Sequence, residues 1–103
     1  MHKRDNRKSE VARIASERID ELFRQAEIKF KEEPKLSDRY VELARKISMK
    51  CKVKIPRELK RRFCKNCHKF LVPGANLRVR IQGKKVVYHC NSCNNYMRYS
   101  LHN

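Results

Sequence analysis

The chain has 103 residues, 37% charged and 40% hydrophobic, with 27 Lys and Arg against 11 Asp and Glu for a formal charge of +16. This length allows one small domain at most. No apolar run approaches the roughly 20 residues of a membrane-spanning helix, and the N-terminus leads into no apolar signal segment. We therefore expect a cytoplasmic protein that is neither membrane-bound nor secreted. In such a compartment cysteines more often bind metal or do redox chemistry than form disulfides.

The charge is distributed unevenly along the chain. Residues 1–33 hold 9 basic and 8 acidic side chains, residues 34–63 hold 11 and 3, and residues 64–103 hold 7 and none. A basic excess of this size repels itself in the free protein, and a nucleic acid would neutralise it. The alternative is a basic face that is merely solvated.

Two amphipathic helices are predicted in the first half. Over residues 8–32, Ile19, Phe23 and Ala26 belong to an apolar stripe with a spacing of three and four residues. Pro34 is expected to stop this helix. A second helix is predicted from Ser37, as its N-cap, to about Lys52.

Two helices joined as a hairpin bury little surface on their own, so some of their apolar side chains should remain exposed. We expect this surplus to bind a protein partner, although it could instead pack on the C-terminal segment. The expected partner-binding residues are Ile14, Leu22, Phe23, Phe30, Tyr40, Leu43 and Ile47.

The last 40 residues change to strand patterning. Residues 77–81 alternate apolar and basic side chains, Gln82-Gly83 is a turn signal, and residues 85–89 form a returning strand. Residues 96–101 could add a third strand. The fold class expected is small α+β: a two-helix hairpin followed by a ribbon with a three-stranded antiparallel sheet.

Four of the five cysteines form two pairs, Cys64 with Cys67 and Cys90 with Cys93, in the pattern C-x2-C-x22-C-x2-C. Two such pairs can supply all four thiolate ligands of a tetrahedral zinc ion. We therefore predict one structural zinc whose binding supplies much of the folding free energy of this segment. A redox dithiol would need a Cys-x-x-Cys pair near a βαβ pattern, which this sequence lacks. An iron–sulfur centre could use four cysteines, but nothing else in the sequence favours one. A catalytic zinc site keeps an open position, whereas four cysteines complete the shell.

Three further side chains are candidates for chemistry near this site. His68 and His89 each adjoin a cysteine, and we interpret both as imidazoles beside the ligands rather than as ligands. We interpret Cys51, on the stripe of the second helix, as a small buried hydrophobe.

A cationic surface is predicted from the linker through the ribbon, because Arg and Lys bind phosphate oxygens. Tyr88, Tyr96, Tyr99 and Phe63 are interleaved with it and could stack on bases, although Phe63 and Tyr88 better fit a small core. The expected nucleic-acid-binding residues are Lys50, Lys52, Lys54, Arg57, Lys60, Arg61, Arg62, Lys65, Lys69, Arg78, Arg80, Lys84, Lys85 and Arg98.

Together, the two helices, the basic linker and three short motifs resemble a known family. The motifs are Arg61-Arg62-Phe63-Cys64-Lys65-Asn66-Cys67, Leu71-Val72-Pro73-Gly74 and Arg78-Val79-Arg80, and they resemble archaeal ribonuclease P protein component four, the zinc-ribbon subunit related to a eukaryotic nuclear ribonuclease P subunit. One departure is Asn94, where such ribbons often have Gly. Asn tolerates a left-handed backbone, so the turn should survive.

The resemblance implies a non-catalytic subunit of the RNA-based endoribonuclease that removes the 5′ leader from precursor tRNA. It implies residues 1–55 as a helical hairpin that binds the barrel-shaped protein component one, 56–63 as a basic linker, and 64–103 as a zinc ribbon that binds the specificity domain of ribonuclease P RNA. The alternatives are a zinc-ribbon DNA-binding protein of the transcription machinery and a ribosomal protein.

Overall fold

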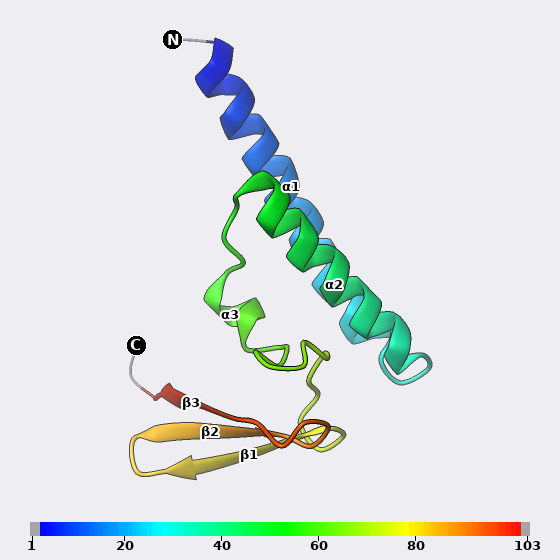
Figure 1. Ribbon diagram of the computed structural model, residues 1–103, viewed down its shortest axis with the longest axis vertical. Coiled ribbons are helices and arrows are strands. Elements are labelled where there is room, and N and C mark those ends of the chain that lie inside the picture. Colours follow the sequence, from blue (N-terminus) through cyan, green and yellow to red (C-terminus); the bar gives the residue numbers. More distant parts are fainter. Residues whose placement is uncertain (1–2, 102–103) are drawn as a thin grey trace.

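The computed structural model describes residues 3–101, with side chains from residue 9 onward, and shows a helical hairpin above a small sheet (Figure 1). None of the helices in this range combines the length and apolar character needed to cross a bilayer. The small α+β fold class is confirmed. The elements are α1 (Lys3–Lys29), α2 (Pro34–Cys51), α3 (Arg57–Lys60), β1 (Leu77–Gln82), β2 (Lys85–Cys90) and β3 (Tyr96–Ser100).

The connection between α1 and α2 differs from the prediction. Helix α1 ends at Lys29 and α2 begins at Pro34, which takes the first helical position that suits proline. Ser37 is therefore not the N-cap; it lies inside α2, fully buried, and its hydroxyl donates a hydrogen bond to the backbone oxygen of Ala26. The prediction failed because this serine has a partner on the neighbouring helix.

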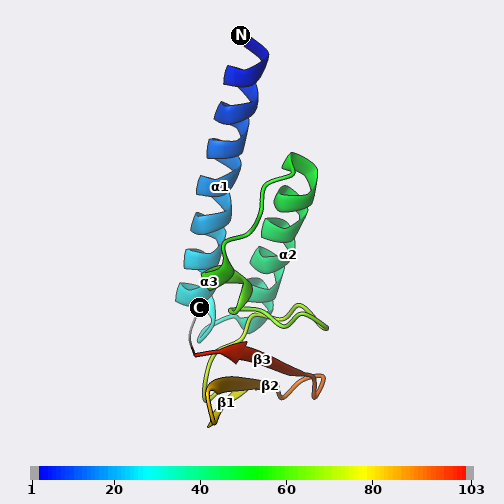
Figure 2. The ribbon, with the colours of Figure 1, turned by 90° about the vertical axis from the view of Figure 1, so that its left-hand side faces the viewer.

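The two helices lie side by side, and α1 extends well beyond α2 at its N-terminal end (Figure 2). Their facing sides bury Ile19, Phe23, Ala26, Val41 and Ala44. Burial of this apolar surface is the main force that holds the pair together.

This core also includes residues from beyond the hairpin. Phe63 stacks at 5.9 Å from Phe23, and Phe70 at 6.0 Å from Phe30, measured between ring centroids. Phe23 is only 1% exposed. Part of the apolar surplus is thus covered by the C-terminal half of the chain, which corrects the expectation that Phe23 is available to a partner protein.

The linker contains an unpredicted short helix, α3, and is tied to the hairpin by polar contacts. Arg62 forms an ion pair with Glu27 at 2.8 Å. The backbone N–H of Phe70 donates to the carboxylate of Asp38 at 2.9 Å. Residues far apart in the sequence therefore fix the ribbon against the helices.

The sheet has the order β1-β2-β3 with both pairs antiparallel, so the predicted third strand is confirmed. Gly83, at φ 60°, begins the two-residue turn between β1 and β2. A second, smaller core lies between the sheet and the cysteines and contains Leu71, Leu77 and Met97. The sheet is thus held at one end, where the cysteines gather.

Candidate metal centre and cationic surface

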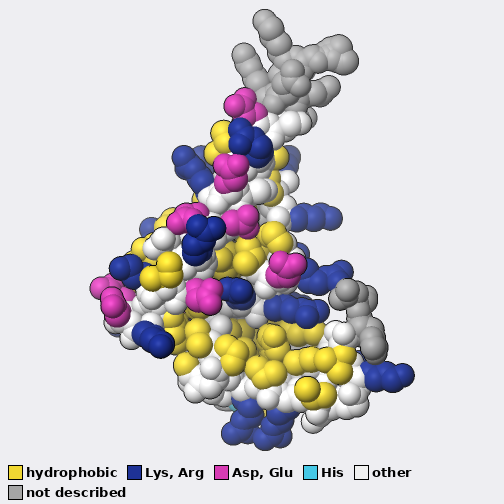
Figure 3. Space-filling model, turned by 180° about the vertical axis from the view of Figure 1, so that it is seen from behind, with side chains coloured by type: hydrophobic (Ala, Val, Ile, Leu, Met, Phe, Trp, Pro, Cys, Tyr) yellow, Lys and Arg dark blue, Asp and Glu magenta, His cyan; other side chains and the backbone are white. Residues whose placement is uncertain are grey.

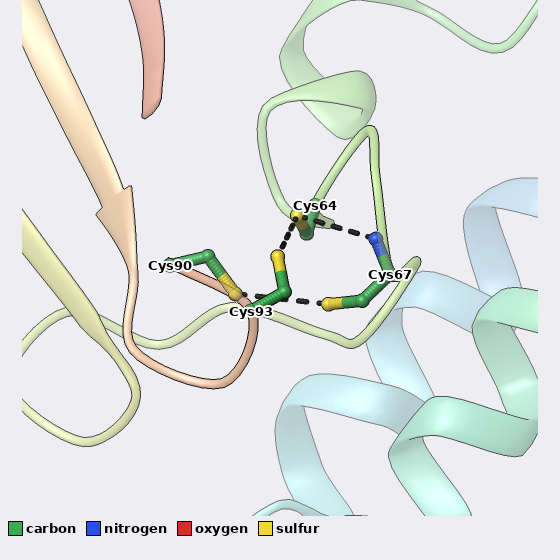
Figure 4. Close-up of side chains that lie close together, drawn as sticks. All are labelled: Cys64, Cys67, Cys90 and Cys93. Carbon is green, nitrogen blue, oxygen red and sulfur yellow. Dashed lines mark hydrogen bonds between the residues drawn. The ribbon is translucent and has the colours of Figure 1, made fainter. Parts of the chain in front are cut away.

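The four predicted cysteines converge at one end of the sheet (Figure 4). All four Sγ atoms lie within 4.8 Å of one another. The Sγ atoms of Cys64 and Cys93 are 3.5 Å apart, and those of Cys67 and Cys90 are 3.7 Å apart. A tetrahedral ion with Zn–S bonds of about 2.3 Å requires separations of about 3.8 Å between sulfurs. The donor set and its spacing therefore fit one tetrahedral, thiolate-bound metal ion.

The two cysteine pairs are built on the same backbone turn. In the first, the N–H of His68 donates to the oxygen of Cys64 at 2.9 Å; in the second, the N–H of Asn94 donates to the oxygen of Cys90 at 2.8 Å. His68 and Asn94 have φ values of 63° and 62°, in the left-handed region. Asn94 thus adopts the conformation for which glycine is favoured, and the turn forms as the sequence predicted.

The environment of the thiols suits metal binding. The backbone N–H groups of Asn66 and Cys67 approach the Sγ of Cys64 at 3.4 and 3.5 Å, where they would stabilise a thiolate. Burial raises the pKa of the Cys67 thiol to about 12, whereas a hydrogen bond from Asn66 lowers the pKa of Cys93 to about 6. A dication at the centre would favour the thiolate form of all four.

The other candidates lie outside this cluster. Within residues 9–101 the metal-ligating group consists of the four cysteines alone, without His68 or His89. His68 packs beside Phe63, with ring centroids 6.4 Å apart, and burial lowers its pKa. Cys51 is half-buried rather than fully buried, at the open end of the helical hairpin.

Three of the predicted cationic residues gather on one face of the sheet. Arg78 and Arg80 are two residues apart on β1, so their side chains point to the same face of the sheet. Arg98 on β3 lies on that face too, because the strand register aligns it with Arg80 through Val87 of β2. Together with Gln82, Val87, His89 and Tyr96 they line a hollow of about 290 Å³. The sheet register therefore creates a cationic face that the sequence only implied.

A second cationic group forms around Tyr99 on the opposite face. The guanidinium of Arg61 lies 4.4 Å from the centre of the Tyr99 ring, and the ammonium of Lys65 lies 5.3 Å from it. Tyr99 also packs edge-on against Tyr88, at 5.1 Å between centroids. These cation–π contacts attach the basic linker and the first cysteine turn to β3.

The remaining predicted cations are exposed, but the structure does not gather them into one site. Arg62 differs from them because its guanidinium is engaged by Glu27. The others, spread over the end of α2, the linker, the first cysteine turn and the hairpin turn, are Lys50, Lys52, Lys54, Arg57, Lys60, Lys69, Lys84 and Lys85.

The sequence analysis missed one residue that shapes the backbone near the site. Asn76 accepts a hydrogen bond from the N–H of Val72 and donates one to the oxygen of Phe70, both at 2.8 Å. It thereby shapes the loop that joins the first cysteine turn to β1. The Pro73-Gly74 turn signal marks this loop, but no sequence signal identifies Asn76 itself.

Apolar side chains line two hollows, one at the open end of the helical hairpin and one between α1 and the C-terminal half. Val11 and Ile14 of α1 are 51% and 41% exposed, and they line a hollow of about 250 Å³ with Ile47 of α2. A larger groove of about 520 Å³ lies between α1, the linker and the ribbon and is lined by Phe30, Phe70 and their neighbours. Figure 3 shows hydrophobic side chains gathered between the helices and the sheet, with Lys and Arg at their margins.

Comparison with known proteins identifies the family. The model of the RNAse P Rpr2/Rpp21/SNM1 subunit domain matches residues 18–94. The chain belongs to this family. Ribonuclease P protein component 4 of Pyrococcus furiosus is 55% identical over 97 residues, covering 91% of this chain and 83% of that protein. Its counterpart in Methanosarcina acetivorans is 44% identical over 96 residues, covering 93% and 90%.

Solved structures of family members agree with the fold described above. A chain in a cryo-EM structure of archaeal ribonuclease P with mature tRNA superposes with a TM-score of 0.79 at 44% identity, covering 84% of this chain and 76% of that one. A structure of Pfu Rpp21 superposes with a TM-score of 0.59 at 54% identity, covering 82% and 96%. The resemblance noted from the sequence motifs is confirmed.

Proposed function

We propose that the chain is a non-catalytic protein subunit of archaeal ribonuclease P, which removes the 5′ leader from precursor tRNA through its RNA. The observation that carries this proposal is the likeness to a chain of archaeal ribonuclease P, at 44% identity and a TM-score of 0.79. The named relatives, ribonuclease P protein components 4, support it. In this role the chain binds and stabilises the RNA, and the RNA performs the hydrolysis.

We further propose that the four-cysteine site holds one structural zinc ion. Cys64, Cys67, Cys90 and Cys93 would supply a complete tetrahedral shell, which leaves no position for a substrate or water. Zinc would join the two cysteine turns and so fix the sheet against the linker. The thiols require a reducing compartment, which favours the cytoplasm.

The RNA-binding surface that we propose is the ribbon and the linker. The 40 residues from Cys64 onward contain 7 basic and no acidic side chains. Arg78, Arg80 and Arg98 share one exposed face, and their guanidinium groups suit phosphate oxygens. Such contacts should bind the specificity domain of ribonuclease P RNA with strong salt dependence.

The helical hairpin, residues 1–55, is the proposed binding site for the barrel-shaped protein component one. Two features support this proposal. The N-terminal part of α1 projects beyond α2 (Figure 1), and its Val11 and Ile14 remain exposed beside Ile47. Leu22, Phe30, Tyr40 and Leu43 are half-buried and can contribute surface, whereas the buried Phe23 supports the core.

Reconstitution with ribonuclease P RNA and component one tests this function. The RNA with both proteins should cleave precursor tRNA at a lower magnesium concentration than the RNA alone. Omission of this chain should raise the magnesium requirement again. Ile28→Ala is the control and should behave as the wild type, because Ile28 is exposed and is not among the residues named above for the cysteine site, the RNA-binding surface or the apolar surface of the hairpin. Cleavage of precursor tRNA by the chain without RNA would contradict the proposal.

A further inference from the structure

The cationic face of the sheet also carries an aromatic pair whose role the core does not explain. Strand register places the residues of this face in two rows across the sheet, because side chains that are paired across strands point to the same side. One row is Arg78, His89 and Tyr96; the next is Arg80, Val87 and Arg98. The face therefore combines three guanidinium groups with two aromatic rings.

Tyr96 is the exposed tyrosine of the sheet. Its side chain is 55% exposed, whereas Tyr88 and Tyr99 are half-buried against each other on the opposite face. The His89 ring lies 4.7 Å from the Tyr96 ring at an interplanar angle of 43°, and the Arg98 guanidinium lies 5.6 Å from it. A tyrosine held in place by its neighbours but open to solvent offers a flat surface on which another ring can stack.

The position of His89 is itself fixed. Its Nδ1 lies 3.1 Å from the side-chain oxygen of Asn91, just after β2. The imidazole therefore supports the Tyr96 ring at a defined angle. This arrangement reduces the conformational entropy that Tyr96 would lose on binding, which favours affinity.

The hollow between these side chains has the size of a small ligand. Its volume of about 290 Å³ lies near the lower end of the range for small-molecule sites, and the side chain of Val87, 6% exposed, lies at its base. This space suits one nucleotide. A duplex offers only its backbone to such a face, because its bases are stacked inside.

The charges of the face select an anion. Among residues 9–101 no carboxylate forms an ion pair with Arg78, Arg80 or Arg98. The sequence from residue 64 onward contains no Asp or Glu. The three guanidinium groups are therefore free to bind phosphates on either side of a base.

We propose that this face binds an unpaired nucleotide of RNA, with its base stacked on Tyr96 beside His89 and its flanking phosphates bound by Arg78, Arg80 and Arg98. The inference rests on the proposed function and deepens it: the ribbon recognises a single-stranded element of its RNA as well as folded backbone. Tyr96 is then a residue that distinguishes unpaired from paired RNA. An acidic peptide would use the arginines but would leave the ring without a partner.

The test compares binding of the zinc-loaded full chain to a short oligouridylate and to an RNA duplex of equal length. Replacing Tyr96 with Leu should weaken binding of the single strand by at least about fivefold, the lower end for a base stacked on an aromatic ring. The slope of affinity against salt should stay the same, because no phosphate contact is lost. Duplex binding should not change, Tyr96→Phe should restore the wild-type affinity, and Val79→Thr, on the opposite face, is the matched control.

A second variant gives a direct signal, because the chain contains no Trp. Tyr96→Trp places a single indole on the face, and a stacked base should quench its fluorescence. The oligouridylate should quench it, whereas inorganic polyphosphate of similar charge should not. Equal effects of Tyr96→Leu on single strand and duplex, or no effect on either, would each overturn the proposal.

The same measurements separate this inference from the proposed function. If the double variant Arg78→Gln with Arg80→Gln leaves affinity and salt slope unchanged for both RNAs, the cationic surface itself is wrong. If that variant weakens both RNAs and flattens the slope while Tyr96→Leu has no effect, only the stacking site is wrong.

Discussion

Asp38, in the first turns of α2, accepts a hydrogen bond at 2.9 Å from the backbone N–H of Phe70, which follows the first cysteine turn. The two residues are 32 positions apart, and the contact is partly buried. Beside it, Phe70 packs against Phe30 of α1. The helical hairpin and the ribbon therefore pack against each other and are not two modules joined by a free linker.

Removal of this acceptor should destabilise the whole chain. Asp38→Ala leaves the partly buried N–H of Phe70 without its partner, which costs about 1–3 kcal/mol. The melting temperature at fixed excess zinc should fall by about 4–8 °C for each kcal/mol. Glu42→Ala, on the same helix but in exposed ion pairs, is the control and should change stability by less than about 1 kcal/mol. Equal effects of the two substitutions would contradict the role given to Asp38.

The aromatic contacts between the helical hairpin and the C-terminal half should contribute more to stability than the hydrogen bond of Asp38. Phe70 is 2% exposed, so Phe70→Ala should cost about 3–5 kcal/mol through lost burial and the cavity that remains. Chemical denaturation followed by circular dichroism of the helices measures this loss. Ile28→Ala is the control, because Ile28 is 59% exposed. A helical hairpin that unfolds at the same denaturant concentration in Phe70→Ala and wild type would show that the ribbon does not support it.

Metal removal should affect the ribbon first and the helices next. Chelation, or Cys64→Ser or Cys93→Ser, should remove the amide dispersion of residues 60–101 in NMR spectra, because zinc binding supplies much of the folding free energy of such segments. The helices should persist with lower stability, since Phe63 and Phe70 would no longer cover them. Sheet dispersion that survives chelation would contradict a structural metal, and Cys51→Ser is the control for a cysteine outside the cluster.

Tyr99 should make stability depend on pH at the alkaline end. Burial raises the pKa of its phenol above the ordinary value of 10, and within residues 9–101 its hydroxyl has no hydrogen-bond partner. The neutral phenol therefore contributes stability below pH 10 that is lost as the pH rises through the folded-state pKa. Tyr99→Phe should be at least as stable as the wild type at pH 7, because it removes a buried hydroxyl without a partner, and its advantage should grow above pH 10. Tyr96→Phe is the control at an exposed site, and parallel pH profiles of the wild type and Tyr99→Phe would contradict the assignment.

Local patterns predicted the elements and the two cysteine turns because both depend on short-range geometry. The Cys-x-x-Cys spacing alone dictates two equivalent turns, and the 3.6-residue and two-residue periods dictate helices and strands. Ser37 illustrates the limit. Serine before an acidic residue is a good N-cap signal, but in this fold its hydroxyl reaches Ala26, 11 residues away. Local sequence carries no information about such a partner.

Contacts between distant segments explain the other differences. Phe23 was expected to remain free for a partner because the sequence does not show that Phe63 covers it. The sequence also gives no local sign of the ion pair between Arg62 and Glu27, 35 residues earlier. The pairing of Tyr96 with His89 required the strand register. Each of these relationships depends on tertiary packing.

Purification of the native particle, followed by sequencing of its bound RNA, is the decisive experiment for the role of this chain in ribonuclease P. Ribonuclease P RNA should be strongly enriched with the intact chain and should be lost when Arg78 and Arg80 are replaced by Gln, with zinc content unchanged. A native particle that contains this chain and its zinc but no RNA would rule out that role.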